Sequence, residues 1–225
     1  GGATGKEAIS EVFREEYKNL YNSHHDQEEM EILTKEMEGE VKEDAVLEVA
    51  RITAEAVQSA MRKVKPGKGD VTGSYTSDAI RNCPPLFFKK MAEMFRSWLY
   101  HGTVTPSLLS CAYLPVFKGG LKDPASCSSY RALAGTSVIL KLFDYTVLQI
   151  WGDLLTSDSL QFAYKPNTSC SQASWLVMEV ADYYRRNDTP CIVTLLDCKQ
   201  GFDRCTFPAI FSKLRKTKLP VIVTR

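Results

Sequence analysis

Asp197 stands where a carboxylate could take part in chemistry. It closes a run of apolar and β-branched residues, 191–196, whose length and composition are typical of a buried strand. A carboxylate at such a strand end is costly unless solvent, a partner group or a metal ion satisfies it. Since Mg²⁺ prefers carboxylate and carbonyl oxygens, a cation site is one interpretation, and a loop or capping role is the other. Asp203 could share such an ion or begin a helix.

Two pairs of cations lie beside glycine-containing loops. Lys118 and Arg131 flank the loop that follows an apolar segment, 110–117, and Lys65 and Lys68 lie in a Gly/Pro-rich loop, 65–73. Arginine binds phosphate through its planar fork and lysine as a point charge, so either pair could hold phosphates. Ordinary exposed lysines and arginines are the alternative interpretation.

The elements that position these residues follow from the apolar periodicity. Segments 110–117 and 191–196 are expected to be strands, and Pro115 indicates an edge or a bulge in the first of them. His101-Gly102 is expected to end one of the helices, and Thr136 or Ser137 to cap another. The pattern predicts a mixed α/β protein with helices over 7–21, 44–63, 86–100, 138–151, 172–186 and 206–216.

Charge and cysteine content narrow the class of protein. Residues 1–60 carry 6 Lys/Arg and 15 Asp/Glu, whereas residues 61–225 carry 22 and 12, which gives net charges of −9 and +10. A basic body with an acidic arm favours a polyanionic partner. Seven cysteines without a C-x-x-C pair indicate reduced, mostly packed thiols in an intracellular protein, nuclear or cytoplasmic. No apolar run is long enough to cross a membrane.

Five motifs occur in an order that resembles one protein family. They are Lys-Pro-Gly-Lys-Gly-Asp at 65–70, Leu-Pro-Val-Phe-Lys at 114–118, Ser-Tyr-Arg-Ala-Leu at 129–133, Gln-Phe-Ala-Tyr-Lys at 161–165 and Leu-Asp-Cys-Lys-Gln-Gly-Phe-Asp-Arg at 196–204. Together they resemble the fingers and upper palm of reverse transcriptases of non-LTR (LINE-type) retrotransposons. The resemblance implies a helical acidic arm over 1–63, a fingers-like region over 64–190 and the start of the palm over 191–225.

The resemblance also implies a role for single residues. Asp197 matches the first metal-binding aspartate, with the Cys198 carbonyl as a neighbouring ligand, and Phe202 matches the aromatic residue beside the sugar of the incoming nucleotide. Lys118 and Arg131 match residues that hold the triphosphate. The residues expected beside template or other nucleic acid are Lys65, Lys68, Gln161, Tyr164 and Lys165.

The implied parent activity is that of an RNA-directed DNA polymerase, which uses Mg²⁺, dNTPs, an RNA template and a DNA primer. The family's second catalytic element, an aromatic-x-Asp-Asp hairpin, does not follow Arg204. We therefore expect no polymerisation by this chain alone, and self-association through a truncated palm.

The family usually has Ala at Gly201, Gly at Ala163, and Pro or Gly followed by Ile at Ala132-Leu133. These departures indicate relaxed constraint or a decayed copy. The alternative interpretation is a non-catalytic element-derived module that binds nucleic acid or protein. A helical interaction module built on 7–63 is a third interpretation.

Overall fold

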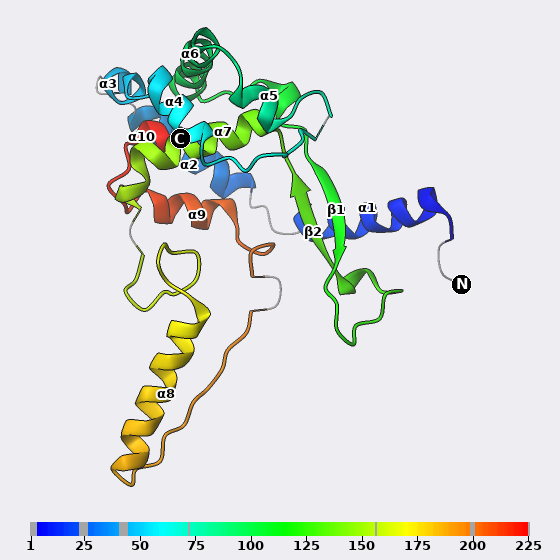
Figure 1. Ribbon diagram of the computed structural model, residues 1–225, viewed down its shortest axis with the longest axis vertical. Helices are drawn as coiled ribbons and strands as arrows, with labels where there is room; N and C mark the ends of the chain where they lie inside the picture. The colour runs from blue at the N-terminus through cyan, green and yellow to red at the C-terminus, as the bar shows by residue number, and fades with distance from the viewer. Residues whose placement is uncertain are drawn as a thin grey trace. The chain divides into compact units, whose positions relative to one another are not determined.

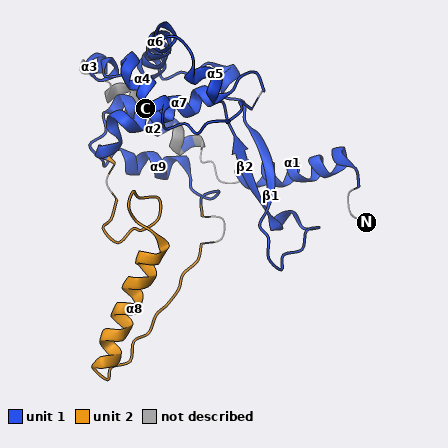
Figure 2. Ribbon diagram, in the orientation of Figure 1, with its two compact units in different colours: residues 1–154, 202–225 blue, residues 155–201 orange. Residues whose placement is uncertain are grey.

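The computed structural model describes residues 4–22, 27–40, 45–71, 73–155, 157–198 and 201–224. These residues form two compact units, 1–154 with 202–225 (unit 1) and 155–201 (unit 2), shown in different colours in Figure 2. They are mostly helical, with a single two-stranded sheet among them, which confirms the mixed α/β class in its broad sense. The boundaries of the units differ from those of the predicted regions 1–63, 64–190 and 191–225, whose functional meaning stays a prediction.

The core of unit 1 lies between three helices, α4 (Ala54–Met61), α6 (Pro85–His101) and α7 (Val138–Trp151) (Figure 1). The predicted helices 86–100 and 138–151 are confirmed almost to the residue. In α6 the buried side chains recur every three or four residues, so one broad face enters the core. The Ser137 hydroxyl caps α7 by accepting a hydrogen bond from the Ile139 N–H at 3.2 Å. The fully buried side chains include Val57, Met61, Phe88, Phe95, Val138, Leu142 and Trp151.

The predicted helix 44–63 is wrong as one element, because the chain forms α3 (Ala45–Ala50) and α4 with a break between them. At the break Thr53 has an extended backbone, and its hydroxyl accepts a hydrogen bond from the Ala56 N–H at 3.2 Å. This cap starts α4 anew. Ile52 beside it is fully buried, so the break also lets an additional side chain enter the core.

The other helices of unit 1 are short or lie at its surface. The predicted helix 7–21 is confirmed as α1 (Lys6–Asn22), and the acidic stretch that follows forms α2 (Gln27–Glu40). The predicted helix 206–216 is present as α9 (Phe207–Leu214). The remaining helical elements are α5 (Ser77–Arg81), α10 (Val221–Thr224) and the 3-10 turns η1 (Pro106–Leu108), η2 (Cys127–Ser129) and η3 (Gly152–Leu154).

The sheet is an antiparallel hairpin of β1 (Ala112–Phe117) and β2 (Tyr130–Gly135). Its register pairs Ala112 with Gly135 at one end and Phe117 with Tyr130 at the other. The predicted strand 110–117 is therefore confirmed. Each strand has an open edge, which allows β1 to contain Pro115 although proline has no N–H to donate.

Unit 2 consists of α8 (Cys170–Arg186) and the segments on either side of it (Figure 1). The predicted helix 172–186 starts earlier, because Ser169 and Gln172 form a capping box, and Ser171 lies inside the helix. The predicted buried strand 191–196 is wrong: these residues form no strand in the structure, and all are exposed. A strand needs a hydrogen-bonding neighbour, and the strands that the structure describes, β1 and β2, pair with each other.

The cysteines are all free, in agreement with reduced thiols. The prediction that they are mostly packed is wrong, because Cys83 and Cys127 are partly buried and the other five are exposed. Three of the exposed ones, Cys170, Cys191 and Cys198, belong to unit 2, where no side chain of α8 is buried. No helix of the described residues has the length and apolar character that a membrane crossing requires.

Candidate functional site

Lys118 and Arg131 are brought together by the β1–β2 hairpin. Arg131 pairs with Val116 in the register, and the ladder continues past β1 with the Lys118 N–H donating to the Ser129 carbonyl at 2.9 Å. Residues two apart on a strand share a face, so Lys118 and Arg131 are diagonal neighbours on one face of the hairpin. Two cations of different geometry thus start from one rigid surface.

The two cations differ in how firmly they are held. The Lys118 ammonium donates a hydrogen bond to the Ser128 carbonyl at 2.6 Å, which keeps this partly buried side chain against the hairpin. Gly119 and Gly120 follow it with φ of 76° and 70°, left-handed values that suit glycine. The Arg131 side chain is exposed, so its guanidinium is open to a ligand.

Lys65 and Lys68 belong to a loop whose backbone is fixed by α5. The Ser77 hydroxyl donates to the Lys65 carbonyl and accepts from the Lys68 N–H, both at 3.0 Å, while the Gly67 N–H donates to Asp78 at 2.8 Å. Both lysine side chains are exposed, as are those of Arg62 and Lys63 just before them. Four exposed cations therefore follow one another from Arg62 to Lys68, and two of them lie on a loop with an ordered backbone.

Asp197 and Cys198 lie at the end of the exposed, extended segment 191–198 of unit 2. Lys199 and Gln200 of the same motif lie outside the described residues. Among the residues that the structure describes, no group of three or more His, Cys, Asp or Glu is arranged to hold a metal ion. Asp197 offers one carboxylate and Cys198 offers one backbone carbonyl oxygen. Both are donors of the kind that Mg²⁺ prefers.

Asp203 has a protein partner in unit 1, since its carboxylate accepts a hydrogen bond from the Tyr21 hydroxyl at 3.0 Å. Partial burial, and then this hydrogen bond to a carboxylate, raise the pKa of Tyr21. The contact links the end of α1 to the turn before α9. Asp203 therefore has a structural role, although its partner is a tyrosine and not a helix start. Phe202 beside it is 76% exposed.

Gln161, Tyr164 and Lys165 lie in the loop of unit 2 that precedes α8. The Gln161 side-chain amide donates to the Ala163 carbonyl at 3.1 Å, and the Lys165 ammonium donates to the Asp158 carbonyl at 3.3 Å. Tyr164 has a left-handed φ of 58° and is 87% exposed. The loop thus holds its two polar side chains close to its own backbone and presents the Tyr164 ring to solvent.

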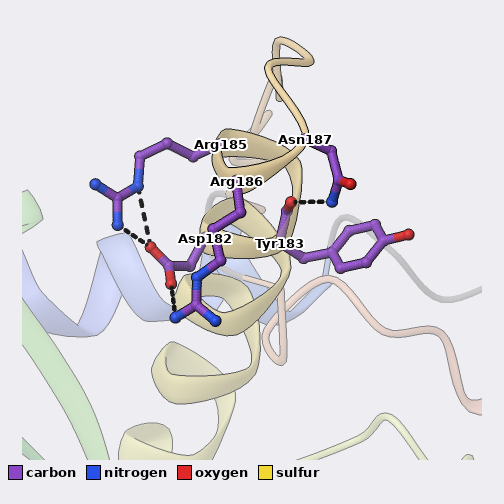
Figure 3. A network of polar contacts seen from close by, with 5 residues as sticks. All are labelled: Asp182, Tyr183, Arg185, Arg186 and Asn187. Carbon is purple, nitrogen blue, oxygen red and sulfur yellow. Dashed lines mark hydrogen bonds and ion pairs between the residues drawn. The ribbon is translucent and has the colours of Figure 1, made fainter.

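The C-terminal end of α8 carries two arginines whose charge is largely shared with one carboxylate. Asp182 accepts hydrogen bonds from Arg185, at 3.0 Å from its Nε, and forms an ion pair with Arg186 (Figure 3). The hydrogen bonds from Arg185, with the charges of both arginines, hold the pKa of Asp182 below its usual value. The carboxylate offsets one of the two positive charges, so we expect the end of α8 to bind phosphate less well than the loop at Lys65 and Lys68, whose charged groups no carboxylate pairs with in the contacts above.

The predicted residues thus fall into separate groups. The hairpin brings Lys118 and Arg131 together, and the α5 loop brings Lys65 and Lys68 together. Asp197 belongs to unit 2 and the hairpin cations to unit 1, so their proximity stays a prediction.

The sequence reasoning missed a groove between α1 and β1. Its α1 residues follow a helical spacing, which was visible in the sequence as one face of the helix over 7–21. The partner strand was not visible, because β1 lies about ninety residues further along the chain.

Comparison of the chain with models of known protein families and with curated proteins finds no match.

Proposed function

We propose that this chain supplies the nucleotide-binding fingers and the first metal-binding aspartate of a LINE-type reverse transcriptase, an RNA-directed DNA polymerase. The observation that carries the proposal is the placement of Lys118 and Arg131 on one face of the β1–β2 hairpin. Diagonal neighbours across an antiparallel pair lie about 7–8 Å apart, a separation that long cationic side chains span around a triphosphate. The order of the five motifs supports the same assignment.

The remaining residues extend the proposal to nucleic acid. Lys65 and Lys68 contact the phosphates of the RNA template or the DNA primer, and their loop is ordered without using the charged ends of their side chains. Gln161, Tyr164 and Lys165 lie beside the template, where the exposed Tyr164 ring offers a surface for base stacking. Phe202 lies beside the sugar of the incoming dNTP.

Asp197 and Cys198 offer Mg²⁺ donor atoms of the right kind, but fewer of them than a polymerase site needs. The Asp197 carboxylate and the Cys198 carbonyl are hard oxygen donors, whereas polymerases hold two ions with several carboxylates. We therefore expect no primer extension by this chain alone. Seven free thiols support an intracellular site of action, nuclear or cytoplasmic.

The test is equilibrium binding of a fluorescent dNTP with Mg²⁺ present. Arg131→Ala should weaken binding about tenfold, and Arg131→Lys by less, because lysine keeps the charge and loses the fork. Lys89→Ala, which removes an exposed cation from α6, is the matched control and should leave binding unchanged. Equal affinities of wild type and Arg131→Ala for the dNTP would contradict the proposal that the hairpin binds the triphosphate.

A second candidate function is binding of nucleic acid without catalysis, favoured by the four exposed cations from Arg62 to Lys68. Counterion release predicts that the logarithm of the affinity falls linearly with the logarithm of the salt concentration. Lys65→Ala with Lys68→Ala should reduce that slope by about 1–2 units. A flat salt response in wild type would count against both functions, while a normal slope without dNTP binding would leave only this second one.

A further inference from the structure

A groove of about 690 Å³ runs along one face of α1 beside β1. Figure 1 shows α1 next to the hairpin. From Lys6 to Tyr21 its helical wall is about 22 Å long at 1.5 Å per residue, and Tyr113 and Pro115 of β1 form the other wall. The helical wall consists of Lys6, Ile9, Ser10, Phe13, Arg14, Tyr17, Lys18 and Tyr21.

The charge of this groove is opposite to that of the arm around it. Three cations, Lys6, Arg14 and Lys18, line it, and none of the described lining residues carries a carboxylate, although Asp203 accepts a hydrogen bond from the hydroxyl of Tyr21 at its far end. The four glutamates of α1 lie on its other faces, although one of them, Glu11, forms an ion pair with Arg14 at 3.1 Å. The groove therefore has apolar and aromatic side chains inside and cations at its rim, although residues 1–60 as a whole are acidic.

Among the residues that line the groove, Tyr17 is the most buried. Its side chain lines the groove and is 8% exposed, and its hydroxyl is buried without a hydrogen-bond partner. A buried, unsatisfied hydroxyl is destabilising, and native proteins rarely keep one. Because the hydroxyl is closed off from solvent, an occupant of the groove meets the Tyr17 ring and not its hydroxyl.

We propose that this groove binds an acidic amphipathic helix of a partner protein. A helix of 12 or more residues spans the distance from Lys6 to Lys18, about 18 Å along α1. Its apolar side chains, spaced at i, i+3, i+4 and i+7, enter the row between Ile9, Phe13 and Tyr17. Its carboxylates meet the cations at the rim. This inference does not rest on the function proposed above.

The aromatic rings of the groove favour a protein partner over single-stranded nucleic acid. Tyr21 stacks on Tyr113 with ring centroids 5.1 Å apart and planes at 19°, and Phe13 packs edge-on against Tyr130 at 5.1 Å. Rings that already pack on one another leave few faces for bases. The glutamates on the outer faces of α1 would also repel a long polyanion, whereas a compact helix meets only the cationic rim.

The test is fluorescence anisotropy with the full chain and a labelled amphipathic peptide of about fifteen residues, with leucines at helical spacing and glutamates on its flanks. Ile9→Asp should weaken binding about tenfold, because it places a charge in the apolar row. Val12→Asp is the matched control, since both side chains are 45% exposed on α1 and only Ile9 lines the groove.

A version of the peptide with lysines in place of the glutamates should not bind. Equal loss of binding in Ile9→Asp and Val12→Asp, or equal affinity of the two peptides, would overturn the proposal. A poly-dT oligonucleotide that binds wild type and not Ile9→Asp, in the absence of peptide binding, would replace it by a nucleic-acid site. None of these outcomes depends on dNTP binding at Arg131.

Discussion

Gly102 holds a backbone conformation that other residue types adopt only with strain. It follows α6 with φ of 64° and ψ of 22°, and its N–H donates to the Trp98 carbonyl. This left-handed ending turns the chain back toward the core, where Trp98 is buried. A side chain at this position meets its own backbone, whatever space surrounds it.

We predict that Gly102→Ala lowers the free energy of unfolding by about 1 kcal/mol. Urea unfolding followed by circular dichroism measures it. Gly152→Ala is the matched control: Gly152 ends α7 with an ordinary helical φ of −59°, and an added Cβ there meets no atom within 4 Å. It should leave stability unchanged or raise it by about 0.5 kcal/mol. A loss of stability in the control as large as that in Gly102→Ala would refute the conformational explanation.

At the scale of residues, the sequence predicts local geometry well and long-range partners poorly. Lys118 and Arg131 lie on one face of the hairpin, because strand pairing across a glycine-containing loop is a local property. The partner of Asp203 is Tyr21, 182 residues earlier, and no spacing in the sequence indicates it. The unsatisfied hydroxyl of Tyr17 also appears only once the fold surrounds it.

The contact between α3 and the end of α7 depends on Glu48. Its carboxylate accepts a hydrogen bond from the indole N–H of Trp151 at 2.9 Å and forms an ion pair with Arg51 at 3.0 Å. The hydrogen bond from Trp151, and after it the contacts with Arg51, lower the pKa of Glu48 below its ordinary 4.5, although partial burial opposes this. Trp151 is 1% exposed, so its N–H has no alternative in solvent.

We predict that Glu48→Ala lowers the free energy of unfolding at neutral pH by about 2 kcal/mol, because it leaves the buried Trp151 N–H without an acceptor. Glu48→Gln keeps an acceptor oxygen and should cost about 1 kcal/mol. A carboxylate with a lowered folded-state pKa stabilises fully above its unfolded pKa, and this contribution disappears as pH falls through the folded value. Below about pH 4.5, wild type should therefore approach Glu48→Gln in stability.

Chemical denaturation between about pH 3 and about pH 7 measures this change in stability, because carboxylates titrate in that range. Glu93→Gln is the control, since Glu93 also forms a helical ion pair, with Lys90 at 2.7 Å, but contacts no buried donor. Its effect on stability should be small at every pH, as for exposed pairs in general. A pH profile of Glu48→Gln parallel to that of wild type would show that Glu48 does not titrate with folding.

At the scale of elements, apolar periodicity predicts those helices that carry a continuous apolar face of their own to bury. The helix over 86–100 is an example, because its own sequence carries a broad apolar face that enters the core. The division of 44–63 into α3 and α4 was missed, since Thr53 could equally have stood inside a helix. The segment 191–196 has strand propensity, but pairing requires a neighbour that its own residues cannot provide.

At the scale of the whole molecule, the two units differ in how they bury apolar surface. Unit 1 has a continuous core from Ile52 to Trp151, whereas no side chain of α8 in unit 2 is buried. Trp175 and Met178 on α8 are 63% and 71% exposed. Exposed apolar side chains that lie together on one face usually mark a place where another molecule binds.

We predict that the chain self-associates through 191–196. Ile192, Leu195 and Leu196 are each at least 90% exposed, and the backbone of this segment forms no strand pairing among the described residues. Extended apolar segments with unpaired N–H and C=O groups pair with one another, so the sedimentation coefficient should rise with concentration. Ile192→Lys with Leu196→Lys should abolish this rise, because charges on one side of the segment oppose pairing. Leu121→Lys, at a fully exposed leucine of unit 1, should not change it. A concentration-independent monomer in wild type, or an equal effect of Leu121→Lys, would show that 191–196 is not the associating segment.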